Sequence, residues 1–292
     1  GWAFMAPFAV LFTFVFILPI IWAIYSSFFR QVTEGGGAYG GGELVNKFVG
    51  FQNFQYAITS GNFWSGVGRV LIYTLIQVPI MIIAALALAI VIDSFVVKHV
   101  TGFRLGYFLP YAIPGVVASI IWVYLYNGQI SPIVKGLAAI GVNVDFFNKN
   151  IVLGSMANIT TWTFTGYNML IFLAALQAIP HDLYEAARID GSGEFHTFNA
   201  IVLPIMKPAL AVQAIFQFVA NWNSLFLPSL IINSTGKKTL TMFVQMLMGE
   251  SFRADYGVIF LALSITILPM SIMYFLLSRY IVEGVSLGSV KG

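Results

Sequence analysis

Six long stretches of the chain contain no Asp, Glu, Lys or Arg, at residues 7–29, 70–92, 105–126, 151–180, 208–232 and 256–278. A helix needs about 20 apolar residues to cross a bilayer core of about 30 Å, and each stretch reaches that length. A membrane β-strand needs only about 9–11 residues and alternates polar with apolar positions, which segment 70–92 does not do. The pattern predicts an all-α polytopic membrane protein with six transmembrane helices.

The connections between these stretches are too short to fold as separate domains. We therefore expect a single transmembrane domain over residues 1–292, with both termini on the same side of the membrane. Lys and Arg are spread over both sets of loops, so the positive-inside rule does not orient the chain by itself.

The composition agrees with a membrane protein and excludes several classes of function. Of the 292 residues, 59% are hydrophobic and only 9% are charged, whereas a soluble domain carries about 25% charged residues. A soluble globular enzyme is excluded on this ground. The net charge of +3 gives no electrostatic support for a nucleic-acid partner. The absence of Cys excludes disulfides and thiolate metal sites.

The connection at 181–207 differs from the others because it carries signals for helix ends. Asp182 can cap a helix, with Glu185 three residues later as in a capping box. Gly191 stands where that helix would end in a left-handed turn. The segment is expected to form a short helix, a turn and a second helix outside the bilayer.

The second helix of this connection is expected to begin at Ser192 as its cap and to be limited by Pro204. On the first helix, small residues spaced three or four apart predict a face that another surface can approach closely, made of Leu183, Ala186, Ala187 and Asp190. From the residues alone, an amphipathic connector resting on the membrane explains the segment equally well.

A spaced motif in this connection carries a family resemblance. It consists of Glu185-Ala186-Ala187, Gly191, Ile201 and Leu203-Pro204. The motif resembles the EAA motif of ABC importer permeases, and the run 188–191 (RIDG) is similar to its carbohydrate, maltose-type branch. Segment 48–54 (FVGFQNF) and the tail 284–292 also resemble this branch, the tail in particular its G-type subunit. The resemblance extends from about Phe48 to Gly292.

The resemblance implies a permease subunit of an ATP-driven importer for a sugar, with an oligosaccharide as the expected form. Its implied location is the bacterial inner membrane, with both termini and the 181–207 loop in the cytoplasm. The implied partners are a second homologous permease, two ABC ATPase subunits, an extracytoplasmic solute-binding protein, the sugar and the lipid bilayer. The chain itself is implied to bind no cofactor and no metal and to have no catalytic residue, while the ATPase subunits bind ATP and Mg.

Two segments are candidates for contact with the ATPase subunits. In the loop, the residues that match the motif are Glu185, Ala186, Ala187, Asp190 and Gly191. In the tail, the positions that match the family contact are Ser289, Val290 and Lys291. A helix cap is the alternative role for Glu185, and a frayed terminus is the alternative for the tail.

Polar residues inside the apolar stretches form a third candidate site. Gln213, Gln217 and Asn221 share one helical face at a spacing of four, and Asn223, Trp162 and Asn168 are further candidates. Amides buried in a membrane usually join helices by hydrogen bonds. The alternative is a translocation path, in which amides bind the hydroxyl groups of a solute and aromatic side chains stack on its rings.

Other transport functions remain open from the sequence. An importer permease of the same class for a non-sugar solute is an alternative. A secondary transporter typically couples through acidic residues within the membrane, and no Asp or Glu lies in any of the six stretches. A membrane scaffold or sensor is the remaining alternative.

Overall fold

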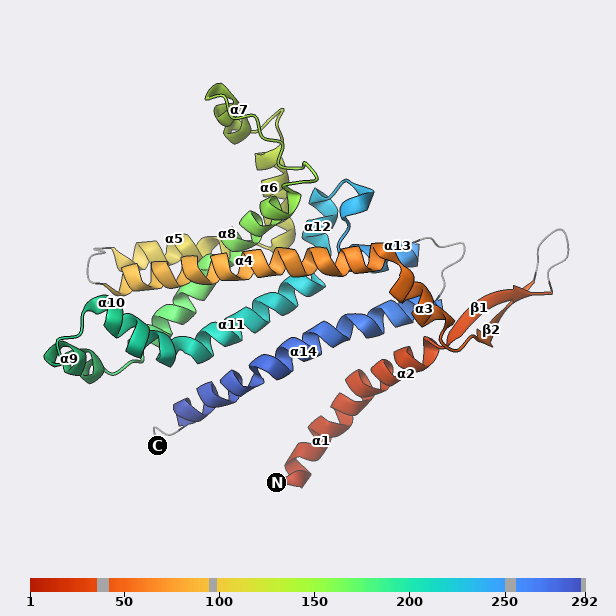
Figure 1. The fold of residues 1–292 in the computed structure, drawn as a ribbon, viewed down its shortest axis with the longest axis horizontal. Helices are drawn as coiled ribbons and strands as arrows, with labels where there is room; N and C mark the ends of the chain where they lie inside the picture. The colour runs from red at the N-terminus through yellow and green to blue at the C-terminus, as the bar shows by residue number, and fades with distance from the viewer. Residues whose placement is uncertain (36–41, 95–98, 250–255, 290–292) are drawn as a thin grey trace. The chain divides into compact units, whose positions relative to one another are not determined.

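The computed structural model describes residues 1–35, 42–94, 99–249 and 256–289 (Figure 1). The chain divides into two compact units. Unit 1 comprises Gly1–Gly68 and Thr239–Ile272, and unit 2 comprises Arg69–Lys238 and Met273–Gly292. Helices α4 (Gly61–Asp93) and α14 (Tyr256–Ser289) each contribute to both units.

Unit 1 holds the first apolar helix, a two-stranded hairpin and short helices. Its further elements are α1 (Trp2–Phe12), the π-helical η1 (Thr13–Ile17), α2 (Leu18–Ser26), β1 (Phe29–Glu34), β2 (Glu43–Phe48), α3 (Gln52–Thr59) and α13 (Leu240–Gly249). The all-α expectation missed the hairpin, in which β1 pairs with β2 in antiparallel register. The buried amide of Asn53 fixes its base by donating to the carbonyls of Ser27 at 2.9 Å and Phe29 at 3.0 Å.

Unit 2 holds most of the helical bundle. Its further elements are α5 (Val100–Ala112), α6 (Gly115–Tyr126), α7 (Pro132–Ala139), α8 (Val152–Gln177), α9 (His181–Ile189), α10 (Glu194–Thr197), the π-helical η2 (Phe198–Val202), α11 (Leu203–Asn223), α12 (Phe226–Ile231) and the 3-10 turn η3 (Thr235–Lys237).

The expected membrane helices are confirmed as a set. In the described part of the chain, five helices are long and apolar enough to cross a membrane, at Trp2–Ser26, Gly61–Asp93, Val152–Gln177, Glu194–Asn223 and Ile259–Leu276. The third expected helix, 105–126, is instead a pair, α5 and α6, bent by 94°. Pro114 causes this break, because it lacks an amide hydrogen and holds Ile113 in an extended conformation at φ −77° and ψ 128°.

The fifth membrane helix also has other boundaries than predicted. The expected range was 208–232, whereas the apolar helical run covers Glu194–Asn223. The charge of Lys207 had set the predicted start, but this side chain lies on an exposed face and the helix continues through it. At the other end, Ser224 is extended with ψ 120°, and α12 follows as a separate short helix.

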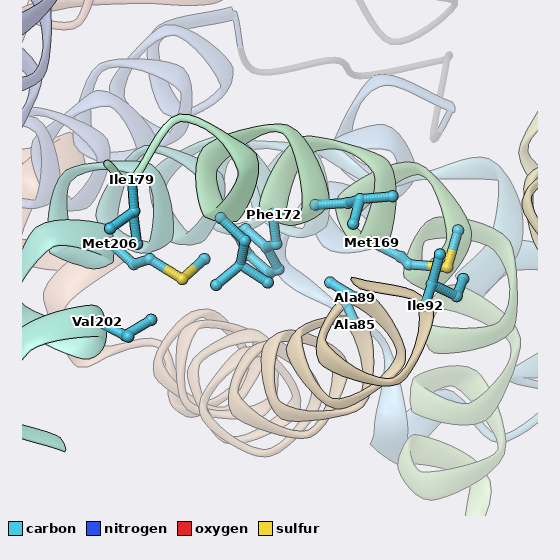
Figure 2. Packing of buried hydrophobic residues seen from close by; sticks show 10 residues of the cluster. Ala85, Ala89, Ile92, Met169, Phe172, Ile179, Val202 and Met206 are labelled. Atoms are coloured by element: carbon cyan, nitrogen blue, oxygen red, sulfur yellow. The ribbon is translucent and has the colours of Figure 1, made fainter. Parts of the chain in front are cut away.

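The main apolar core of unit 2 joins α4, α8 and the segment formed by η2 and α11 (Figure 2). Small Ala85 and Ala89 of α4 face Phe172 of α8, and Val202 and Met206 are further members of the ten-residue cluster. The small side chains of α4 leave room for the large side chains of α8 and α11, which fill the space between the helices. This core lies in the part of the bundle from which the 181–193 connection emerges.

A second close contact in unit 2 lies between α5 and α8. Gly166 of α8 faces the backbone carbonyl of Tyr107 in α5, and a Cβ atom at this position would overlap that carbonyl. One turn away, the rings of Tyr111 and Tyr167 stack with their centroids 4.4 Å apart. Gly166 therefore permits the helix contact that the tyrosine stack extends.

Candidate functional site

The connection between α8 and α11 forms a helical elbow, defined here as residues 181–197. Its first arm, α9, begins at His181 after Pro180, and no side chain caps it. The expected capping box of Asp182 and Glu185 is therefore absent. The N-cap residue is Pro180 instead. Its non-helical backbone conformation, at φ −59° and ψ 132°, directs the chain into the first turn of α9. Asp182 lies in the first turn, where its negative charge interacts favourably with the positive end of the helix dipole.

Gly191 closes the first arm, as predicted, in a left-handed conformation with φ +74°. The amide of Gly191 donates to the carbonyl of Arg188 at 3.1 Å, and the amide of Ser192 donates to that of Ala187 at 2.9 Å. These two bonds form a Schellman motif, which satisfies carbonyls at the end of a helix. The turn is consequently fixed by the backbone and does not behave as a loose loop.

The second arm differs from its prediction at both ends. Gly193, rather than Ser192, is the cap of α10, and the Ser192 hydroxyl lies 2.9 Å from that of Thr197. Pro204 does not end this arm, because α10 continues through η2 into α11. Pro204 directly follows η2, whose π-helical turn departs from the regular α-helical hydrogen-bond pattern and accommodates a residue without an amide hydrogen. The second arm is therefore continuous with a membrane helix.

One side of the elbow is anchored in the apolar core. Tyr184 of the first arm and Phe198, just after the second, pack against the cluster of α4, α8 and α11. Ala187 is buried, with only 5% of its surface exposed. A displacement of the elbow must therefore move the packed ends of these helices, because a close-packed core deforms little.

The other side of the elbow presents apolar side chains to the surroundings. Leu183 is 37% exposed and Ile189 is 85% exposed, and Ala186 lies between them at a spacing of three. Phe195 of the second arm is 83% exposed. The expectation of a single small-residue face is therefore wrong for Ala187. A rotation of about 100° per residue turns Ala187 toward the core and leaves Ala186 outside.

The remaining motif residues of the elbow are exposed. The side chains of Glu185 and Asp190 face the surroundings, and Asp190 is the last residue before the Gly191 turn.

At the base of the elbow, partial burial raises the pKa of Tyr184 and the nearby carboxylate of Asp93 raises it further. The same carboxylate accepts a hydrogen bond of 3.4 Å from Gln177 Nε2. Asp93 thus links the ends of α4 and α8 beneath the first arm.

The tail candidates are only partly covered by the structure. Ser289 is the last residue of α14. Val290 and Lys291 lie outside the described residues, and the tail contact stays a prediction.

Polar side chains of three helices meet in a buried cluster, here called the polar cluster. It consists of Tyr73 and Gln77 of α4, Thr160 of α8, and Gln217 and Asn221 of α11. The Asn221 amide donates to Gln77 Oε1 at 2.8 Å, and its Oδ1 accepts from Gln217 Nε2 at 3.1 Å and from the Tyr73 hydroxyl at 3.3 Å. The Tyr73 and Thr160 hydroxyls lie 2.6 Å apart.

The polar cluster unites two of the six candidates for a translocation path, Gln217 and Asn221. Its other members, in α4 and α8, did not emerge from the sequence reasoning. The sequence does contain an indication of the α4 members, because Tyr73 and Gln77 have the same spacing of four as the residues of α11 and therefore share one helical face. Interhelical hydrogen bonds of this kind join membrane helices.

The other four path candidates lie apart from the polar cluster. Gln213 is buried one turn before Gln217, and Asn223 is exposed with its amide donating to Val219 of its own helix. Trp162 is half-buried, with its ring 5.5 Å from that of Trp122. Asn168 is buried and donates to the carbonyl of Phe164 at 2.9 Å.

Known proteins resemble this chain over most of its length. A family model described as "Binding-protein-dependent transport system inner membrane component" matches residues 54–287. The sulfoquinovosyl glycerol transport system permease protein SmoG of Agrobacterium fabrum is 27% identical over 82% of this chain and 77% of its own length. The lactose transport system permease protein LacF of Rhizobium radiobacter is 30% identical over 74% of this chain and 70% of its own length.

A solved structure shares the fold. It is a chain of a bacterial alginate ABC transporter in complex with an alginate pentasaccharide-bound periplasmic protein. The TM-score is 0.76 at 17% identity, over 95% of this chain and 92% of that one.

Proposed function

Because the chain belongs to the family of binding-protein-dependent transport system inner membrane components, we propose that it is the permease subunit of an ATP-driven importer for a saccharide. The proposed complex also contains a second, similar permease, two ATPase subunits that bind ATP and Mg, and an extracytoplasmic binding protein. In this role the chain catalyses no reaction and supplies the path and the mechanical coupling. Relatives named for sulfoquinovosyl glycerol and lactose support a sugar as the solute.

The observation that carries this proposal is the two-sided elbow. Tyr184 and Ala187 hold it against the core, while Leu183, Ile189 and Phe195 leave an apolar surface outside. An exposed apolar surface on a rigid support is typical of a contact with another protein. The closed turn at Gly191 keeps the two arms in a fixed geometry, so a force on the outer face reaches η2 and α11. A flexible loop would not transmit such a force.

We assign the outer face of the elbow to a socket on the ATPase subunit. In this assignment Ala186 permits close approach, and the exposed carboxylates of Glu185 and Asp190 pair with basic groups of the ATPase. The tail residues Ser289, Val290 and Lys291 are proposed as a second contact with the same subunit. Both assignments place the elbow and the two termini in the cytoplasm and the hairpin of β1 and β2 outside.

We assign the polar cluster a joining role and place the solute beside it. Gln217 and Asn221 use their polar atoms on each other and on α4, which supports a role in holding the three helices. Gln213 is buried on the same face of α11, one turn before Gln217, and is not a member of the polar cluster. It is therefore the favoured path residue of α11, with Trp162 as the aromatic candidate in α8.

The test of the proposed function is reconstitution of the complete complex in proteoliposomes. Ile189→Ser and Phe195→Ser remove the apolar contacts of the elbow without placing a charge there. We expect at least about a tenfold loss of ATP hydrolysis stimulated by the loaded binding protein, equal to about 1.4 kcal/mol of lost contact energy or more. Ile140→Ser is the matched control, because Ile140 is 75% exposed at the end of α7 and should tolerate the change.

Two results would refute the proposal. The first is retention of full coupled uptake by the double elbow variant. The second is ion-driven uptake by this chain alone, which would identify it as a secondary transporter. Removal of residues 286–292 tests the tail separately, with a loss of ATPase stimulation as the expected result and unchanged stimulation as the contrary one.

A further inference from the structure

A cavity of about 470 Å³ lies within unit 1, and none of its lining residues belongs to the elbow or the polar cluster. It is formed by the end of α2, one face of the hairpin and the beginning of α14, and its eight lining residues include Trp22, Tyr25, Phe29, Gln31, Asn46 and Phe260. Its volume falls in the range of about 300–1,000 Å³ that small-molecule sites occupy. The family model match begins at residue 54, so the α2 and hairpin walls lie outside the matched part of the chain.

Aromatic rings form one wall of this cavity. Trp22 and Tyr25 lie three residues apart on α2, and Phe29 follows at the start of β1. The ring centroids of Trp22 and Tyr25 are 5.8 Å apart, and those of Tyr25 and Phe29 are 4.9 Å apart. The three rings therefore form a continuous row, and Phe260 of α14 adds a fourth aromatic side chain to the lining.

The hairpin contributes two amides to the same cavity. Gln31 of β1 and Asn46 of β2 are direct partners in the strand register, so their side chains lie on the same face of the sheet. Phe29 is on this face as well, because it precedes Gln31 by two residues. The cavity thus combines aromatic faces with two neutral side chains that can both donate and accept hydrogen bonds.

The charged residues of the hairpin lie on its other face. Arg30 and Glu34 alternate with the cavity residues along β1, and Lys47 does so along β2. Glu34 and Lys47 approach each other on that other face, with Oε1 and Nζ 3.7 Å apart. Because the strands turn every second residue to the same side, none of these charges faces the cavity. The eight lining residues are all uncharged, which favours a neutral ligand over an anionic one.

We propose that this cavity is a subsite for a neutral saccharide. The aromatic row provides apolar faces for the C–H surfaces of a sugar ring, and the paired amides of Gln31 and Asn46 can bind its hydroxyl groups. The inference rests on the proposed function, which places this end of α2 on the outer side of the membrane. It deepens that function by selecting neutral saccharides over acidic ones such as alginate.

The test is photoaffinity labelling of the complete complex in nanodiscs, with a diazirine derivative of maltose and no binding protein. Labelled peptides are identified by mass spectrometry. We expect label in segments 18–35 and 42–48, competed by at least one of free maltose, trehalose, lactose and diacetylchitobiose but not by alginate oligosaccharides. Label elsewhere only, or label that no neutral sugar displaces, would overturn the inference.

Matched variants separate sugar binding from a mere membrane-interface role of the aromatic residues. Trp22→Ala and Asn46→Ala should each lower the competed labelling about tenfold, a loss of about 1.4 kcal/mol. Ile21→Ala and Val45→Ala are the controls, because these exposed neighbours on the same elements do not line the cavity. Equal labelling in all four variants would assign Trp22 and Tyr25 to the interface belt and overturn the inference.

Failure of the inference and failure of the proposed function give different results. If the unmodified complex imports one of the neutral sugars with ATP but carries no label in this cavity, only the subsite is refuted. If that complex imports no saccharide of the panel, the proposed function is refuted and the subsite with it. If the cavity is a subsite on the translocation path, the Trp22→Ala variant should show reduced uptake. The Ile21→Ala variant should then retain uptake.

Discussion

The side-chain amide of Asn221 in α11 donates a hydrogen bond of 2.8 Å to Oε1 of Gln77 in α4, across 144 residues of sequence. Both side chains are almost fully buried. The same Asn221 accepts hydrogen bonds from Gln217 and Tyr73, so one residue joins four of the five members of the polar cluster.

Replacement of Asn221 by Ala should loosen the contact between α4 and α11. The change leaves Gln77 Oε1 without its donor and the Tyr73 hydroxyl without one of its acceptors, which costs about 1–3 kcal/mol in a buried site. The midpoint of thermal unfolding in detergent should fall. Asn199→Ala is the control, because Asn199 is exposed and donates to the carbonyl of Phe195 in its own segment. Equal midpoints for the two variants would contradict a joining role of Asn221.

Replacement of Gly166 by Ala should separate α5 from α8. The added Cβ would overlap the carbonyl of Tyr107, and a backbone atom cannot move aside as a flexible side chain can. Overpacking of this kind costs about 1–3 kcal/mol, or more where the backbone is involved. The free energy of unfolding reports the loss. Gly154→Ala on the same helix should be neutral, since nothing lies within 4 Å of its added Cβ.

Replacement of Gly191 by Ala should strain the elbow turn. A residue with a Cβ at φ +74° costs roughly 1–2 kcal/mol more than glycine. The variant is expected to insert in the membrane and to couple ATP hydrolysis to uptake poorly, because the arms lose their fixed geometry. Gly193→Ala provides a control two residues away, at φ −73° and in open space. Normal uptake per ATP in the Gly191 variant would show that the turn geometry does not matter for coupling.

The raised pKa of Tyr184 predicts a loss of stability in alkaline solution. The folded protein keeps the Tyr184 proton to a higher pH than the unfolded chain, whose tyrosines titrate near pH 10.0. As the pH rises from about 10 toward the folded pKa, the unfolded state therefore gains stability relative to the folded one. The Tyr184→Phe variant should lose this part of the pH dependence, and Asp93→Asn should reduce it. Unfolding midpoints measured between pH 9 and 11 provide the test, and identical slopes in all three proteins would refute it.

The number and rough positions of the membrane helices could be predicted because they depend on local hydrophobicity. A run such as 70–92 is too long and too apolar for any other structure at a membrane. The Gly191 turn was predictable for a similar local reason, because a left-handed residue at a helix end is usually glycine.

The helix ends and the hairpin were not predictable in the same way. A boundary set at Lys207 was too late, because an exposed face can carry a charge within a continuing helix. The strands of the hairpin are short and follow an apolar helix directly, so their sequence gives only a weak periodic signal. Asn53, in a separate helix, holds the base of the hairpin through hydrogen bonds that the local sequence does not reveal.

The partners of the polar residues depended on tertiary structure alone. The sequence placed Gln217 and Asn221 on one face of α11, because helical spacing is a local property. It could not show that Tyr73, Gln77 and Thr160 would meet that face, since their positions depend on how α4 and α8 pack. In the same way, only the packing decided that Ala187 faces the core while Ala186 remains exposed.

By itself the sequence determined a helical membrane protein with six apolar segments. It also determined a connection with helix-end signals and the motif of a transport family. These features follow from hydrophobicity, helix capping and residue spacing, which act over a few turns of chain. The tertiary structure alone decided which polar groups are paired, which face of the elbow is free and where the aromatic cavity forms. Such features arise from contacts between segments far apart in sequence, and their free energies are set only when the segments pack together.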